Sequence, residues 1–308
     1  MTTPRAILIA GPTASGKSGL ALSLAERLRG VVINADSMQV YEDLAVLTAR
    51  PTPEDVFRVP HALYGFVPGS TAYSTGRYIQ DAARAIAEAH TKGQRPIFVG
   101  GTGLYFTALL EGLSPIPPVS GDVRQHWRKR AQAIGTPALA RELAQRDPEL
   151  AARLSPNDTQ RITRALEVIE ATGESLADWQ KIKGTPVLDE RETIRLVITP
   201  EREDLYRRCD ARLDAMLAGG AVHEVEVLAA KNLDPTLPVM GALGVRPLMQ
   251  ALKGQIELEQ AATLAKNETR QYGKRQLTWL KSHMMSWKSI TAQLSESNIR
   301  EIVSFVDS

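Results

Sequence analysis

The sequence is poor in cysteine, in aromatic residues and in long apolar runs. A single cysteine among 308 residues, Cys209, excludes a disulfide within the chain and any zinc site that needs two or more cysteines. No apolar stretch approaches the roughly 18 residues of a membrane span, and the first apolar run is too short for the core of a signal peptide. We therefore expect a protein of the reducing cytoplasm with no membrane partner.

Net charge is also small, at +2, but the charges are unevenly distributed. Residues 124–164 hold nine Lys or Arg against four acidic residues, and residues 266–288 hold six against Glu268 alone. A polyanionic partner larger than a nucleotide would explain two basic segments in a nearly neutral chain. Solvated helix faces explain them equally well on charge counts alone.

A glycine-rich motif near the N-terminus carries the strongest signal. It matches the pattern G-x-x-x-x-G-K-[ST], follows an apolar run at 6–10 and precedes a helical pattern at 17–29. A strand, loop and helix in this order hold phosphate oxygens with backbone N–H groups at the positive end of the helix, while Lys17 adds a point charge. The predicted phosphate-binding residues are Gly11, Pro12, Thr13, Ala14, Ser15, Gly16, Lys17 and Ser18.

Apolar runs alternate with helical patterns over much of the chain. This alternation predicts an α/β fold, a P-loop parallel sheet with flanking helices. The expected strands are 6–10, 31–35, 62–67, 96–99 and 195–199, and the expected helices between them include 17–29 and 76–92. From residue 201 onward we expect only helices.

Residues 120–185 show only helical patterns, and a proline-rich joint at 114–121 precedes them. We therefore predict a catalytic core of residues 1–114 and 191–308, interrupted by an all-helical insertion domain at 115–190. Within the insertion, Ser155 and Pro156 resemble the N-cap and first position of a helix over 159–172. This helix carries a polar ridge, although any surface helix can look the same; its members are Gln160, Arg161 and Arg164.

Polar residues follow two more of the expected strands. Asp36 and Gln39 come after the strand at 31–35, and Thr102 comes after the strand at 96–99. The carboxyl ends of parallel strands form the ligand crevice of an open sheet, so these side chains should face the phosphates held at 11–18. Each alone could instead serve a turn or a cap.

These motifs together resemble the tRNA dimethylallyltransferases (tRNA isopentenyltransferases), bacterial type without a zinc finger. The resemblance runs in order over essentially the whole chain. The segments that carry it are 11–18, 36–41, 99–105, 155–167, 216–224 and 269–279. The chain departs from the family pattern at 47–51, at His61-Ala62 and at 242–246, none of which touches the P-loop, Asp36 or Thr102.

The resemblance implies transfer of a dimethylallyl group from dimethylallyl diphosphate to the exocyclic amine of the adenosine next to the anticodon in tRNA. The P-loop would then hold a leaving diphosphate, with Mg²⁺ bound partly by Ser18 and with Arg208 as a second contact. Asp36 would act as the general base and Thr102 would hydrogen-bond beside it. The implied contacts to the anticodon stem-loop of tRNA are Asp36, Ser37, Met38, Gln39, Thr102, Arg124, Gln160, Arg161, Thr163, Arg164, Lys266, Arg270 and Lys274.

Three alternatives stay open at this point, and a monomer is the default state for all of them. A small-molecule or nucleoside kinase would use ATP at the P-loop, but it gives no role to the insertion or to the basic segments. A prenyltransferase acting on free adenine nucleotides would not need the ridge on 159–172. A GTP-dependent RNA-binding switch would need an Asn-Lys-x-Asp motif, which the sequence lacks.

Overall fold

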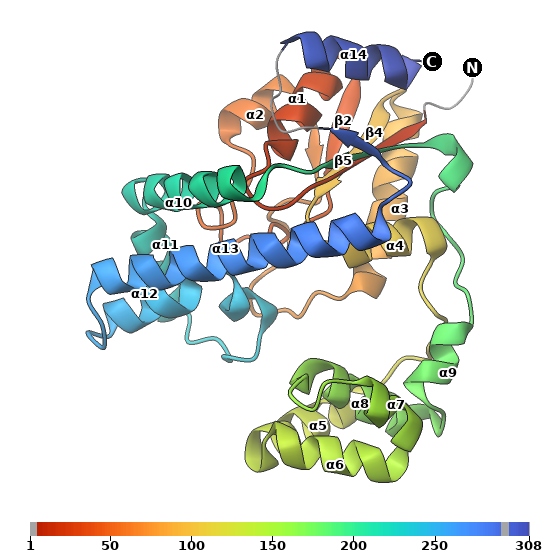
Figure 1. The fold of residues 1–308 in the computed structure, drawn as a ribbon, viewed down its shortest axis with the longest axis vertical. Coiled ribbons are helices and arrows are strands. Elements are labelled where there is room, and N and C mark those ends of the chain that lie inside the picture. The colour runs from red at the N-terminus through yellow and green to blue at the C-terminus, as the bar shows by residue number, and fades with distance from the viewer. Residues whose placement is uncertain (1–4, 291–295, 308) are drawn as a thin grey trace. The chain divides into compact units, whose positions relative to one another are not determined.

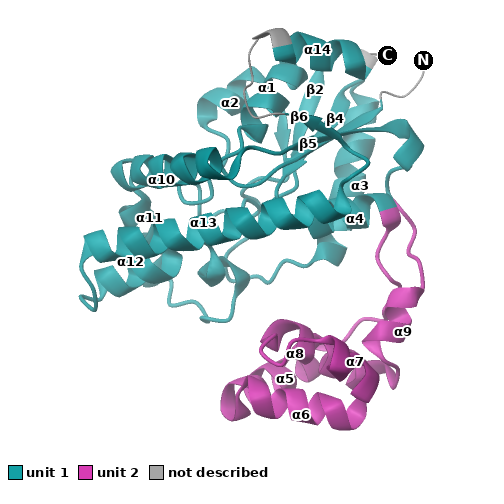
Figure 2. Cartoon of the chain, in the orientation of Figure 1, with its two compact units in different colours: residues 1–110, 187–308 teal, residues 111–186 magenta. Residues whose placement is uncertain are grey.

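The computed structural model describes residues 5–290 and 296–307. It divides into two compact units, unit 1 comprising residues 1–110 and 187–308 and unit 2 comprising residues 111–186 (Figure 2). The sequence places the corresponding boundaries four residues later, at 114/115 and 190/191. Within the described ranges, no helix is both long enough and apolar enough to cross a lipid bilayer.

Unit 1 is built on a parallel sheet, six-stranded in the part of the chain that the structure describes, with the order β3-β2-β4-β1-β5-β6. The α/β fold expected from the sequence is confirmed. The register pairs Ile9 of β1 with Val99 of β4 on one side and with Leu196 of β5 on the other. The strands are β1 (Ala6–Ala10), β2 (Gly30–Asn34), β3 (His61–Ala62), β4 (Arg95–Gly100), β5 (Thr193–Ile198) and β6 (Lys288–Ile290).

Both faces of this sheet are covered, which is why its strands read as continuous apolar runs. Ile7 and Ile9 point to the face that packs on α1 (Lys17–Arg27) and α14 (Glu296–Asp307), which lie side by side in Figure 1. Leu8 and Ala10 point to the opposite face. That face packs on α3 (Thr75–Thr91) and α4 (Gly103–Glu111), and α2 (Pro53–Arg58) precedes β3.

A helical layer extends unit 1 beyond the sheet and has a core of its own. Two long helices, α10 and α13, pack along each other, and α13 runs from α12 back to the sheet (Figure 1). The elements are α10 (Arg202–Ala218), α11 (Ala221–Ala230), η2 (Pro238–Gly241), α12 (Val245–Leu252) and α13 (Leu258–His283), and a short η1 (Glu190–Glu192) precedes β5.

Two of the expected secondary-structure assignments are wrong, one of a strand and one of helices. The strand expected at 62–67 is only His61–Ala62, because the backbone turns at Leu63 and Gly65, whose φ angles are +64° and +56°. Helices were expected throughout the chain after residue 201, but β6 adds three residues to the sheet edge beside β5. Three residues are too few to show an alternating pattern.

Unit 2 is helical throughout, as the sequence predicts for 120–185. Its core surrounds the fully buried Trp127. The predicted helix over 159–172 is confirmed, but its N-cap is Asp158 rather than Ser155, because the Asp158 carboxylate accepts the Arg161 N–H at 3.0 Å. The helices are α5 (Gly121–Ile134), α6 (Thr136–Arg146), α7 (Pro148–Arg153), α8 (Thr159–Thr172) and α9 (Leu176–Lys181).

Candidate active site

Three neighbouring strands bring the candidate site residues together at one edge of the sheet. Strand β4 lies between β1 and β2, so the loops that follow all three strands meet at their carboxyl ends. The P-loop follows β1, Asp36 follows β2 and Thr102 follows β4. The loops are tied together by backbone: Gly11 N–H donates to the Gly100 carbonyl at 3.2 Å. A Cβ at Gly100 would stand 2.0 Å from the Ala35 oxygen, so only glycine fits there.

The P-loop has the backbone shape that phosphate binding requires. Ala14 and Gly16 both have positive φ, +59° and +90°, so successive N–H groups turn toward one concavity at the start of α1. Glycine occupies Gly16 because this left-handed position costs other residues free energy. The Ser15 hydroxyl is fully buried and has no hydrogen-bond partner within the described residues.

Lys17 is the principal cation of the loop. Its Nζ donates to the Pro12 carbonyl at 3.2 Å. Desolvation lowers the pKa of this ammonium group to about 8; the Asp36 carboxylate opposes that shift and the Arg212 guanidinium adds to it. The ammonium is therefore a poorly solvated charge that a diphosphate anion would satisfy.

Arg212 is a second cation at the loop, and the sequence reasoning missed it. Its guanidinium donates to the Thr13 hydroxyl across the gap between α10 and the loop, and burial lowers the pKa of Arg212. The predicted diphosphate contact, Arg208, lies half-buried one turn earlier on the same helix. The i, i+4 spacing of the two arginines was the available signal.

Gln276 on α13 connects two of the loops. Its Oε1 accepts the Thr13 N–H at 2.8 Å and its Nε2 donates to the Gly101 carbonyl at 3.0 Å. Since the side chain is buried, both bonds fix the spacing between the P-loop and the loop after β4. A polar residue among the apolar positions of a long helix was its only signal in the sequence.

Asp36 is held by a buried asparagine. Asn34 Oδ1 accepts the Asp36 N–H at 2.8 Å, and Asn34 Nδ2 donates to the carbonyls of Asp36 and Leu63 at 2.9 and 3.0 Å. The Asp36 Oδ1 accepts the Met38 N–H at 2.9 Å. Oδ2 accepts no hydrogen bond from any residue that the structure describes, so one carboxylate oxygen is oriented and the other is available.

Thr102 and Gln39 extend the same site. Thr102 Oγ1 accepts the Ser37 N–H at 3.0 Å and donates to Ser37 Oγ at 3.3 Å, which binds the loop after β4 to the loop after β2. Gln39 donates both amide hydrogens to the carbonyls of Thr48 and Ala49, each at 2.8 Å.

Three tyrosines lie within electrostatic reach of the Asp36 carboxylate. Burial raises the pKa of Tyr64, of Tyr105 and of Tyr272, and the negative charge of Asp36 raises all three further. All three therefore stay neutral phenols across the physiological range. Tyr105 also stacks on Tyr78, with ring centroids 3.6 Å apart.

The remaining predicted RNA contacts lie on three helices, α5 and α8 in unit 2 and α13 in unit 1. In unit 2, Arg124, Gln160 and Arg161 are exposed, and Arg164 pairs with the buried Glu167 at 3.2 Å. Thr163, also a predicted contact, is buried, with only 8% of its surface exposed. Arg161 also pairs with Asp158 at 3.5 Å, so both arginines of the ridge predicted on α8 have acidic partners on or beside their own helix.

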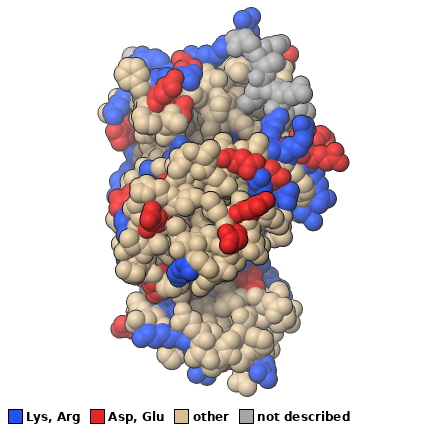
Figure 3. Space-filling view, turned by 90° about the vertical axis from the view of Figure 1, so that its left-hand side faces the viewer, with Lys and Arg blue, Asp and Glu red and all other residues tan. Residues whose placement is uncertain are grey.

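In unit 1, the predicted RNA contacts on α13 are Lys266, Arg270 and Lys274. Two of them form ion pairs within the protein, which the sequence did not reveal. Lys266 pairs with Asp214 at 2.7 Å and Arg270 pairs with Asp210 at 2.9 Å, both on α10. These pairs join the two long helices. Lys274 is exposed, and its side chain has no hydrogen-bond or ion-pair partner among the described residues. On the face that Figure 3 displays, acidic and basic side chains are interspersed and no single sign of charge dominates.

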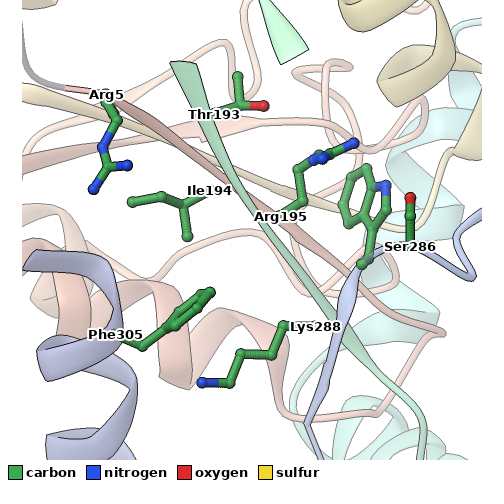
Figure 4. Close-up of a pocket in the computed structure, with 8 residues that line it drawn as sticks. Arg5, Thr193, Ile194, Arg195, Ser286, Lys288 and Phe305 are labelled. Atoms are coloured by element: carbon green, nitrogen blue, oxygen red, sulfur yellow. The ribbon is translucent and has the colours of Figure 1, made fainter. Parts of the chain in front are cut away.

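One small pocket adjoins the site, and a larger pocket lies elsewhere in unit 1. A small one of about 80 Å³ adjoins the P-loop and is lined by Ser18, Gln39 and Tyr64 among others. A larger one of about 430 Å³ lies at the start of β5, away from the P-loop edge of the sheet. Figure 4 shows that its cations do not converge, since the guanidinium of Arg195 points away from Arg5 and Lys288. Its position and its side chains separate it from the phosphate-binding loop.

Within residues 5–290 and 296–307, no group of three or more His, Cys, Asp or Glu side chains is arranged to hold a metal ion.

Comparisons with known proteins agree along the chain. Residues 39–283 match the family model described as IPP transferase, and residues 4–61 match the one described as isopentenyl transferase. The chain is 52% identical to the tRNA dimethylallyltransferase of Bradyrhizobium sp. (strain ORS 278), covering 97% of each chain. It is 54% identical to the enzyme of that name from Beijerinckia indica, covering 92% of this chain and 95% of the relative.

Solved structures show the same relationship. The full-length tRNA isopentenylpyrophosphate transferase from Bacillus halodurans superposes with a TM-score of 0.70 at 32% identity, covering 98% of this chain and 95% of that one. A eukaryotic dimethylallyltransferase acting on tRNA gives a TM-score of 0.78 at 29% identity, covering 94% and 74%. By sequence along nearly its whole length and by fold, this chain belongs to the tRNA dimethylallyltransferase (IPP transferase) family.

Proposed function

We propose that the protein transfers the dimethylallyl group of dimethylallyl diphosphate to the exocyclic amine (N6) of the adenosine that follows the anticodon in tRNA. The observation that carries this proposal is the meeting of a P-loop with a carboxylate: the P-loop follows β1 and Asp36 follows β2 at the same edge of the sheet, and the Asp36 charge partly opposes the lowering of the Lys17 pKa. The relatives, named for dimethylallyl transfer and for action on tRNA, support the choice of donor and acceptor.

The P-loop side of the site suits a leaving diphosphate. Breaking the allylic C–O bond places negative charge on the diphosphate oxygens. The loop N–H groups, Lys17 and Arg212 all face that charge from fixed positions. Donors held in place before the reaction stabilise the transition state because they need no reorganisation, and one such donor typically contributes about 3 kcal/mol.

The carboxylate side suits the acceptor. The N6 amine of adenine is a weak nucleophile because its lone pair is delocalised into the ring. As the N6–C1 bond forms and the C1–O bond breaks, the amine proton passes to Oδ2 of Asp36, the oxygen that accepts no other hydrogen bond in the described chain. A positioned general base contributes about 10²–10⁴-fold to such a step.

Mg²⁺ fits this site only in company with the diphosphate. The described residues offer no carboxylate cluster for it, but Mg²⁺ takes most of its ligands from phosphate oxygens and water in sites of this kind. The exposed hydroxyl of Ser18 and the unpartnered hydroxyl of Ser15 are the protein groups that would hold it. When bound, it would neutralise charge on the leaving group.

A stacked adenosine must leave its loop to reach Asp36, at a cost of a few kcal/mol. Phosphate contacts from unit 2 and from α13 are the proposed source of that free energy. The proposed contacts are Arg124, Gln160, Arg161, Thr163, Arg164, Lys266, Arg270 and Lys274. The tyrosines around Asp36 and the bound RNA itself would keep water from hydrolysing the donor.

We expect the protein to act as a monomer in the cytoplasm. The test of the function uses two labelled donors and an anticodon stem-loop RNA. Label from carbon-labelled dimethylallyl diphosphate should enter the RNA, and label from the terminal phosphate of ATP should not. Transfer of the ATP phosphoryl group to any acceptor would instead support the kinase alternative.

A further inference from the structure

One carboxylate in unit 1 lies outside the chemistry described so far and binds three backbone groups in a row. Glu224 on α11 accepts the N–H groups of Ala45, Val46 and Leu47, at 2.5, 2.8 and 2.9 Å. Hydrogen bonds from N–H groups to an ionised carboxylate are about twice as strong as neutral ones. Glu224 therefore fixes this segment in one conformation.

The last two residues of the same segment, 45–49, bind the side-chain amide of Gln39. The carbonyls of Thr48 and Ala49 each accept from Gln39 Nε2 at 2.8 Å. Ala49 has a φ of +52°, an unfavourable value for a residue with a Cβ, so the turn needs external support. The turn closes on the residues that Glu224 binds, since the Ala49 N–H donates to the Val46 carbonyl and the Arg50 N–H donates to the Ala45 carbonyl, each at 3.0 Å.

This arrangement also decides which atom of Gln39 is left for a ligand. Both partners of the amide nitrogen are carbonyl oxygens, so the nitrogen must point toward them and Oε1 must point elsewhere. Among the described residues, nothing donates to that oxygen. Gln39 also lines the pocket beside Ser18 and Tyr64, next to the P-loop. Gln39 is therefore an oriented acceptor in the site.

We propose that Glu224 is a positioning residue: by ordering residues 45–49 it holds the Gln39 carboxamide with Oε1 ready to accept a hydrogen bond from the exocyclic amine of the target base. The inference rests on the proposed function, which supplies that base. An amine at this position donates a hydrogen bond to Oε1. A keto oxygen at the same position would be repelled, because both oxygens are hydrogen-bond acceptors. Glu224 thus acts through Gln39 on the choice of base.

The binding test compares two anticodon stem-loops that differ only in the target nucleoside, adenosine or inosine, which has a keto group in place of the amine. The wild type should bind the adenosine RNA about tenfold more tightly, the effect of one hydrogen bond and one lost repulsion. Glu224→Gln should reduce this ratio severalfold, and Glu224→Asp, which keeps the charge on a shorter side chain, should fall between the two. An unchanged ratio in Glu224→Gln would overturn the inference.

A matched control separates positioning from mere stability. The Asp43 carboxylate is also nearly inaccessible and also binds backbone, since it accepts the Gly69 N–H at 2.6 Å and pairs with Lys231. Its carboxylate makes no hydrogen bond to residues 45–49. Asp43→Asn should lower Tm to a similar extent as Glu224→Gln and leave the adenosine-to-inosine ratio at its wild-type value.

A double variant tests whether Glu224 acts through Gln39. Gln39→Met removes the acceptor, so Glu224→Gln added to it should reduce the kcat/KM of transfer no further. Additive losses would contradict the inference. Hydrogen exchange of the backbone amides of residues 45–47 should accelerate in Glu224→Gln. This measurement does not depend on RNA binding. If the wild type transferred no prenyl group, the proposed function would be wrong. The ratio of the affinities for adenosine and inosine RNA tests the role of Glu224 separately.

Discussion

The lowered pKa of Lys17 leads to a sharp prediction about pH. The ammonium group loses its proton near pH 8, because the loop desolvates it more than Asp36 stabilises it. A free lysine keeps its charge to about pH 10.4. Between these two values the empty loop lacks its principal cation, and a diphosphate binds to the minority of molecules in which Lys17 is still charged.

The size of the effect follows from the titration. With a pKa of about 8, half of Lys17 is charged at pH 8 and about a tenth at pH 9, so the affinity for diphosphate should fall about fivefold over this unit, or about 1 kcal/mol. Stability should move in the opposite direction. The folded state binds fewer protons than the unfolded state from pH 8 to pH 10.5, so the contribution of Lys17 raises the free energy of unfolding across this window, by about 3 kcal/mol in full. Weaker binding therefore cannot be ascribed to unfolding.

Calorimetric titration of inorganic diphosphate, from about pH 7 to about pH 9.5, measures this directly. Lys17→Arg keeps its charge throughout and reports how much the ionisation of diphosphate itself contributes. Asp36→Asn removes the group that raises the pKa of Lys17, so in this variant the fall should begin at a lower pH. A wild-type affinity that follows Lys17→Arg at every pH would refute the reasoning.

Further variants test the other parts of the site. Asp36→Asn keeps the size and backbone contact of the side chain but removes the base, so transfer should fall by about 10²–10⁴-fold while Tm and RNA binding stay near wild type; weakened RNA binding with intact transfer would contradict the assignment. Gly100→Ala places a Cβ 2.0 Å from a backbone oxygen and should cost about 3 kcal/mol by thermal unfolding, whereas Gly241→Ala, in open space, should change stability by less than about 0.5 kcal/mol. Arg164→Ala should weaken tRNA binding and reduce the slope of log Kd against log salt by about one; a lower Tm with an unchanged slope would show that Arg164 serves only Glu167.

The parts of the fold that a local pattern encodes could be predicted from the sequence. The P-loop, the buried strands and the helix over 159–172 all combine a period with a boundary signal within a few residues. The β6 strand could not be predicted, because three residues carry no period and the strand depends on β5 for its pairing. The cap at Asp158 was missed because Ser155 offered an equally good local motif, and tertiary context chose between them.

The site shows the same division. Asp36 and Thr102 closely follow strands, so their place at the carboxyl edge of the sheet could be predicted from the sequence. Arg212, Gln276 and Glu224 come from helices far along the chain, and only the folded structure brings them to the P-loop or to residues 45–47. Long-range polar contacts of this kind have no period, so sequence patterns give no signal for them.

The central claim is that a P-loop here holds the diphosphate of a prenyl donor while Asp36 prepares an adenine amine. Mass spectrometry of the nucleosides of an anticodon stem-loop, after incubation with the protein, dimethylallyl diphosphate and Mg²⁺, tests it most directly. The account predicts that one adenosine, the one following the anticodon, gains a dimethylallyl group in place of a hydrogen. Unmodified adenosine, with ATP consumed and a phosphoryl group appearing on an acceptor, would contradict it.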